Sequence, residues 1–165
     1  MRYDVFVTVW GQDFVTKFVD LSLSSQLAPG NLPALAAEAD VHYHIYTDRD
    51  SQVNFEPALA SLSEYTEPHF HFYDEIPYSG GTLDQAIQNS DISTAKHNVQ
   101  RITAQHMLAG LKESAAILMD SDFIIADGSL MRMHQLRLAG KQAVMVPLMR
   151  LNEATAGPML YEDLS

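Results

Sequence analysis

The 165-residue chain contains no cysteine, which excludes disulfide bonds, thiolate zinc sites and a cysteine nucleophile. Basic residues are also scarce, because ten Lys and Arg stand against 21 Asp and Glu, a formal net charge of -11. Such a surface repels anionic polymers and no Lys/Arg cluster interrupts it, so nucleic acid and anionic lipid are not expected partners. An anionic ligand would need a metal cation or a helix N-terminus to offset this charge.

Long apolar runs and several well-known motifs are missing as well. No apolar stretch approaches the roughly 18 residues that span a bilayer, and the N-terminus enters a strand pattern without the layout of a signal peptide. We therefore expect a cytoplasmic protein without a membrane span. The chain has no Walker loop, no Gly-x-Gly-x-x-Gly fingerprint and no Gly-x-Ser-x-Gly elbow. It also lacks Asp-x-Asp-x-Thr after the first strand, which disfavours a phosphatase of the haloacid-dehalogenase type.

What is present is a globular composition, with 47% hydrophobic and 19% charged residues. Strand-like and helix-like segments alternate, which predicts a mainly parallel sheet with helices on both faces, a three-layer Rossmann-like α/β domain over residues 1–148. The tail, 149–165, carries no predicted element. The expected strands are 3–10, 41–47, 69–76, 115–119 and 142–148, and the expected helices are 13–25, 51–64, 93–109 and 129–139.

Local signals set several of these boundaries. Asp13 is the expected N-cap of the first helix, whose apolar stripe is assigned to Phe14, Phe18 and Leu21, with Ser25 as a candidate fourth position. Pro57 is expected to interrupt the second helix early, and Gly110 to end the third.

Two predicted strands share a histidine pattern, His42-x-His44 and His69-x-His71. Histidines two apart on a strand lie on the same face. One interpretation is simple amphipathic alternation in both strands. The other is that the two strands are neighbours and present all four imidazoles on one face as a metal site.

The main candidate for chemistry is Asp120-Ser121-Asp122, directly after a buried apolar strand. The carboxyl edge of a parallel sheet is where ligands bind in open α/β folds. Two close carboxylates are costly unless a cation lies between them, and their hard oxygens suit Mg²⁺ or Mn²⁺. The alternative is a pair of solvated turn residues.

This arrangement resembles the nucleotide-diphospho-sugar transferase family, the GT-A type of glycosyltransferase, in which Asp-x-Asp follows the fourth strand. Three stretches carry the resemblance, which covers about residues 3–148: Val5 to Gly11 followed by a helix, Ile45-Tyr46-Thr47-Asp48, and the segment from Gln100-Arg101-Ile102 through Ile117–Asp122 to Gly140.

The resemblance implies a nucleotide-sugar donor and a Mn²⁺ or Mg²⁺ cofactor. Asp122 would be the principal metal ligand, and Asp120 would bind the metal through water or contact the ribose. Arg101 would add positive charge beside the phosphates, with His97 one turn earlier on the same helix face. The remaining implied donor-site residues are Thr8, Trp10, Gly11 and Asp48, with Trp10 either stacking on the base or packing in the core.

The second half of such transferases, which builds the acceptor site, has no recognisable counterpart after Asp122. We therefore expect the donor-binding half of a glycosyltransferase, with the acceptor and the catalytic residue undefined. The chain could belong to a longer transferase, complete its site by homo-oligomerisation or with a partner, or keep the fold without the reaction. The competing interpretation is a non-catalytic interaction or scaffold domain of the same architecture.

Overall fold

The computed structural model describes residues 1–111, 113–146, 151 and 153–164. Its main sheet contains four strands, all parallel, in the order β3-β2-β1-β6. A separate two-stranded antiparallel hairpin follows β3 in the chain. The strands are β1 (Arg2–Thr8), β2 (Asp40–Thr47), β3 (Glu67–Phe72), the hairpin strands β4 (Pro77–Tyr78) and β5 (Gly81–Thr82), and β6 (Ala115–Asp120).

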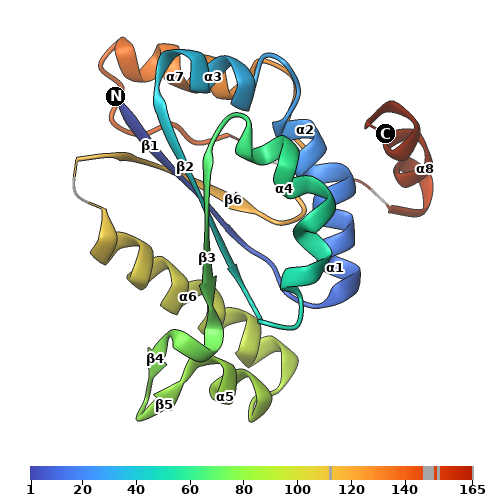
Figure 1. The fold of residues 1–165 in the computed structure, drawn as a ribbon, viewed down its shortest axis with the longest axis vertical. Coiled ribbons are helices and arrows are strands. Elements are labelled where there is room, and N and C mark those ends of the chain that lie inside the picture. The colour runs from blue at the N-terminus through green and yellow to red at the C-terminus, as the bar shows by residue number, and fades with distance from the viewer. Residues whose placement is uncertain (112, 147–150, 152, 165) are drawn as a thin grey trace.

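One face of the sheet carries the larger apolar core. Alternate residues of β1 and β2, among them Val5, Val7 and Tyr43, are fully buried there. The chain crosses this face in several helical segments (Figure 1). They are α1 (Gln12–Lys17), the π-helical turn η1 (Phe18–Leu23), α2 (Ser24–Gln26), α3 (Leu32–Glu38), the 3-10 turn η2 (Gln52–Phe55), α4 (Glu56–Ser63) and α7 (Ser129–Leu138).

The opposite face is covered only in part. Phe6 and Tyr46 pack there against Val99 and Ile102 of α6 (Ile92–Gly110). The turn η3 (Tyr73–Glu75) and α5 (Leu83–Gln88) complete this second, smaller core. On β6 the same face is open, because Leu118 is 65% exposed in the part of the chain that the structure describes. Helices therefore lie on both faces of an α/β sheet.

The last described element, α8 (Glu153–Leu164), contacts η1. Figure 1 shows it at the side of the molecule, beyond α1 and α2. Among the described residues no helix is both long and apolar enough to cross a membrane.

Most predicted elements are confirmed, including the helix that ends at Gly110. The predicted strand 142–148 is wrong over its described part, since residues 142–146 form no strand; 147 and 148 lie outside the described residues. Asp13 is not the N-cap, which is Gly11, and Phe14 is 65% exposed while neighbouring Val15 is fully buried. The third strand ends at Phe72, before a 3-10 turn. Helices α3 and α5, the hairpin strands β4 and β5, and helix α8 in the tail were not predicted.

Candidate functional site

The strand order reverses between β1 and β6. The connection from β1 leads to β2 on one side, whereas the connection from β3 passes through α6 and returns to the other side of β1. Crevices at such switch points, beyond the carboxyl ends of the strands, are the usual ligand sites of open α/β sheets. Here Thr8 and Asp120 are direct register partners at the ends of the two strands. The structure thus brings two of the predicted donor-site residues together.

Hydrogen bonds with buried polar residues of η1, α2 and the start of α3 hold the loop after β6. Ser22 Oγ donates to Phe123 O at 2.6 Å, and Ile125 N donates to Ser25 Oγ at 3.1 Å. Asn31, itself fully buried, donates through Nδ2 to Ala126 O at 3.2 Å. Ser22 and Asn31 were not predicted to be buried. Ser25, a candidate member of the helix stripe, was not connected to the loop after β6 because the two lie about 100 positions apart.

A close approach of two loops extends this network. Gly30 N donates to Asp127 Oδ1 at 2.6 Å. A Cβ atom on Gly30 would lie 2.7 Å from that oxygen and 2.8 Å from Gly128 N, closer than real side chains come. Glycine is therefore required at position 30 for the loop that follows β6 to be held in place.

The loop after β1 is closed by a second set of hydrogen bonds. Gly11, with φ of 81°, donates its N–H to Asp48 Oδ2 at 3.1 Å and to Ser51 Oγ at 3.0 Å. Asp48 also accepts from Ser51 N and Ser51 Oγ, both at 2.8 Å. Asp48 therefore fixes the geometry of two loops. Beside it lies a hollow of about 350 Å³, lined by Gly11, Gln12, Asp48, Asp50, Ser51, Val53 and Asn54.

The other predicted donor-site residues are spread along α6 and the strand ends. Trp10 is partly buried and packs edge-to-face on Tyr73, with ring centroids 5.9 Å apart, which supports the core-packing interpretation of this side chain. Arg101 is exposed on α6, its Nη2 3.5 Å from Tyr78 Oη. His97, one turn earlier, and Asp122 are also exposed.

The four histidines lie together on the partly open face of the sheet. β2 and β3 are neighbours, with His44 the register partner of His69. The imidazoles pair across the strands, His42 Nδ1 with His69 Nε2 and His44 Nδ1 with His71 Nε2, each at 3.0 Å. The structure therefore contains the strand adjacency and the shared histidine face that the metal-site interpretation requires.

Each histidine pair ends on a carboxylate. His42 Nε2 lies 3.2 Å from Asp40 Oδ2, and His44 Nε2 lies 2.9 Å from Asp4 Oδ1. Because an ionised carboxylate can only accept, each of these Nε2 atoms carries the proton. The Nδ1 atom of a neutral ring then keeps its lone pair and faces the partner histidine.

Burial and neighbouring charges set the protonation of His44 and His71, called here the inner pair. Burial, together with neighbouring imidazoles, lowers the pKa of His71 to about 4, and burial also lowers the pKa of His44 against the attraction of Asp4. Burial alone would raise the pKa of Asp4, but hydrogen bonds from three groups outweigh it and hold that pKa well below its usual range: Arg2, Ser114 and His44. At neutral pH the inner unit is therefore an ionised carboxylate with two neutral imidazoles.

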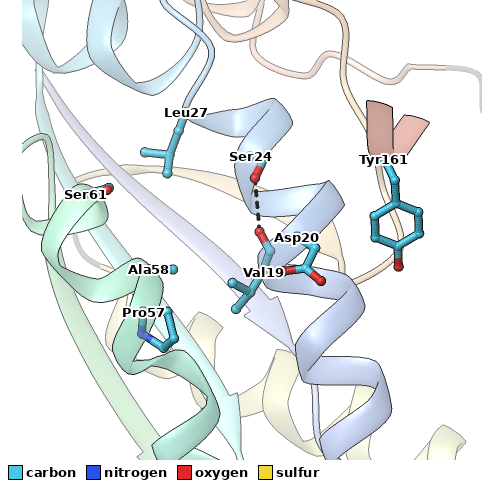
Figure 2. A pocket seen from close by; sticks show the side chains of 8 residues that line it. All are labelled: Val19, Asp20, Ser24, Leu27, Pro57, Ala58, Ser61 and Tyr161. Carbon is cyan, nitrogen blue, oxygen red and sulfur yellow. Dashed lines mark hydrogen bonds between the residues drawn. The ribbon is translucent and has the colours of Figure 1, made fainter. Parts of the chain in front are cut away.

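A larger hollow lies away from all of these groups. Figure 2 shows it between η1 and α4, with Tyr161 of α8 at one side. Its volume is about 480 Å³, and its lining is mainly apolar and hydroxyl side chains with one carboxylate, Asp20. No predicted site residue lines it, so its size alone does not make it the candidate site.

Comparisons with protein-family models, with curated proteins and with solved structures found no match for this chain. The candidate site is therefore supported by the sequence motifs and by the geometry described above.

Proposed function

We propose that this chain binds a nucleoside-diphosphate sugar at the carboxyl edge of its sheet, as the donor-binding part of a metal-dependent glycosyltransferase with a Rossmann-like fold. The observation that carries the proposal is the position of Asp120, the register partner of Thr8 at the point where the strand order reverses. In open α/β sheets, ligands bind beyond the carboxyl ends of the strands at such a reversal point.

Asp120 and Asp122 would hold Mn²⁺ or Mg²⁺. Both are exposed, only one residue separates them, and the loop that follows them is anchored by Ser22, Ser25 and Asn31. Carboxylate oxygens on an anchored loop fit a hard divalent cation that keeps open positions for phosphate oxygens. Bound there, the cation would act as a Lewis acid and stabilise the departing diphosphate.

A bound metal cation would also offset the repulsion between this acidic chain and an anionic diphosphate. A chain with net charge -11 attracts cations and repels a free diphosphate. Arg101, exposed on α6, supplies one fixed positive charge for the phosphates. His97 is on the same helix face and is a further candidate contact.

The nucleoside would lie toward the loops after β1 and β2. Gly11, Asp48 and Ser51 form a closed hydrogen-bonded unit there, beside the hollow of about 350 Å³. Because both Asp48 oxygens already accept hydrogen bonds, we assign Asp48 to holding the loop in shape, and a contact with the ligand would be additional. Trp10, packed on Tyr73, would form the edge of this region.

A non-catalytic interaction domain is the second candidate function, and one observation favours it. Leu118 in the middle of β6 is 65% exposed and Ala116 on the same face is also exposed. An uncovered apolar strand face is typical of a surface that another protein segment covers. On this interpretation Asp120 and Asp122 would be ordinary turn residues.

Thermal unfolding with UDP, GDP, CDP and ADP, each with and without Mn²⁺, separates the two functions. A ligand at about 100 times its Kd adds about 2.7 kcal/mol to the unfolding free energy, which is several degrees for a chain of this size. We expect one nucleotide to stabilise the protein only with Mn²⁺, and Asp122→Asn to abolish the shift. Glu64→Gln, which removes the same charge from an exposed position after α4, should retain it. No shift with any pair would refute donor binding by this chain.

A further inference from the structure

His42 and His69, the outer histidine pair, have a third potential metal ligand beside them in Glu67. Glu67 begins β3 and is the register partner of His42. Its Oε2 lies 3.5 Å from His42 Nδ1 and 3.9 Å from His69 Nε2, while the two nitrogens are 3.0 Å apart. Two imidazole nitrogens and one carboxylate oxygen therefore form a triangle on the surface of the sheet.

The size of this triangle matches a transition-metal ion. The point equidistant from the three atoms is about 2.0 Å from each of them, the length of a Zn–N or Zn–O bond. We propose that His42 Nδ1, His69 Nε2 and Glu67 Oε2 form a binding site for Zn²⁺, with water as the fourth ligand.

The surroundings of His42 fit this assignment independently. Metal-bound histidines usually donate their other N–H to a carboxylate, which fixes the ring and its tautomer. His42 Nε2 has this partner in Asp40 Oδ2, at 3.2 Å. In the ion-free pair, His69 Nε2 carries the proton that faces the lone pair of His42 Nδ1. When the ion binds, His69 releases this proton to solvent and takes one up at Nδ1, so the ring changes tautomer and both ligating nitrogens present lone pairs.

The solvent exposure of the three ligands and their chemical type also fit a Zn²⁺ site. The side chains of His42 and His69 are 14% and 33% exposed, and that of Glu67 is 67% exposed, so an ion can reach the site from solvent without a change of fold. Imidazole ligands favour Zn²⁺ and its transition-metal neighbours over Mg²⁺ and Mn²⁺. The inner pair lacks such a third ligand, since His42, Glu67 and His69 are the metal-ligand group found among the described residues.

This site is separate from the proposed donor site. His42 is aligned with Asp4 and Asp120 with Thr8, which is four residues, or about 13 Å, further along the sheet. At that distance the ion would not touch a donor. It would instead cross-link the edge strand β3 to β2 and raise the stability of the sheet edge.

Isothermal titration of the untagged, chelator-treated full chain with ZnCl₂ tests the proposal. We expect one Zn²⁺ per chain, and no comparable binding of MgCl₂. His42→Gln, His69→Gln and Glu67→Gln should each weaken binding at least 10-fold, and Asp40→Asn by about 10–100-fold. Glu64→Gln, which removes an exposed carboxylate after α4 just as Glu67→Gln removes one from β3, should leave the affinity unchanged.

Two further measurements keep the test decisive. Circular dichroism and melting of the metal-free variants show whether each is folded. If a histidine variant does not fold, Glu67→Gln still tests the site, because it changes only a mostly exposed side chain. Asp120→Asn combined with Asp122→Asn should keep the Zn²⁺ site while losing Mn²⁺-dependent nucleotide binding. Absence of binding at micromolar Zn²⁺, or binding that these variants do not alter, would overturn the proposal.

Discussion

Asn31 connects three segments of the chain, and its replacement by alanine should destabilise the protein strongly. The side chain is fully buried. Nδ2 donates to Ser25 O at 2.8 Å and to Ala126 O at 3.2 Å, and Oδ1 accepts from Leu130 N at 3.0 Å. Asn31→Ala removes all three hydrogen bonds and leaves three backbone groups to find other partners.

The expected loss follows from the usual value of such bonds. A buried hydrogen bond contributes about 0.5–1.5 kcal/mol, and groups left unpaired raise the cost, so Asn31→Ala should lower the unfolding free energy by about 2–4 kcal/mol. In a chain of this length that corresponds to a fall in Tm of about 5–15 °C. The loop that carries Asp122 should also lose order, so Mn²⁺-dependent nucleotide binding should weaken.

Urea unfolding followed by circular dichroism measures this loss. The matched control is Asn89→Ala, which removes one exposed hydrogen bond, from Asn89 Nδ2 to Gln85 O at 2.7 Å; its expected cost is about 0.5 kcal/mol. An Asn31→Ala variant as stable as the Asn89→Ala variant would refute the argument that this network holds the loop after β6.

Two smaller predictions concern other parts of the fold. The pKa of Asp4 is lower in the folded chain than in the unfolded one, so the stabilisation by its carboxylate is fully present above about pH 4 and is lost as the pH falls through the folded value. The difference in unfolding free energy between wild type and Asp4→Asn should therefore be constant near pH 7 and shrink below pH 4. A difference that does not change with pH would contradict this. Thr82 and Gln85 form a capping box at α5. Thr82→Ala should therefore lower the unfolding free energy by about 1 kcal/mol and Thr82→Ser by much less, and the fall in Tm of each variant measures this loss.

The sequence predicts the parallel sheet well because each strand carries a local signal. β1 contains the apolar run Val5-Phe6-Val7 and is buried on both faces, and the alternating histidines of β2 and β3 mark their shared face. Which strands become neighbours depends on long-range packing, so the order β3-β2-β1-β6 could not be derived from these patterns.

The errors have physical reasons too. Residues 144–146 are apolar like a strand, but they are exposed and pair with no described strand, and side-chain type cannot reveal a missing neighbour. Helix α3 has only seven residues, too few for a clear periodicity. Phe14 and Val15 are adjacent apolar residues, so composition alone did not decide which of them faces the core.

The candidate site was predictable only where it is continuous in sequence. Asp120 and Asp122 lie at the end of a predicted strand and were predicted directly, and Thr8, the register partner of Asp120, was predicted through the resemblance. The supporting roles of Ser25 and Asn31 were not predicted, because the sequence does not show which distant segment a polar side chain contacts. Their role depends on contacts about 100 positions away.

The measurement that tests the central proposal most directly is the coupling between metal and nucleotide, by isothermal titration. If the cation at Asp120 and Asp122 contacts the diphosphate, Mn²⁺ must raise the affinity for the nucleotide, and the nucleotide must raise the affinity for Mn²⁺ by the same factor. We expect a reciprocal factor of about 5–150, reduced to 1 in Asp122→Asn and retained in Glu64→Gln. Nucleotide binding that is independent of Mn²⁺, or coupling that survives in Asp122→Asn, would contradict the proposed site.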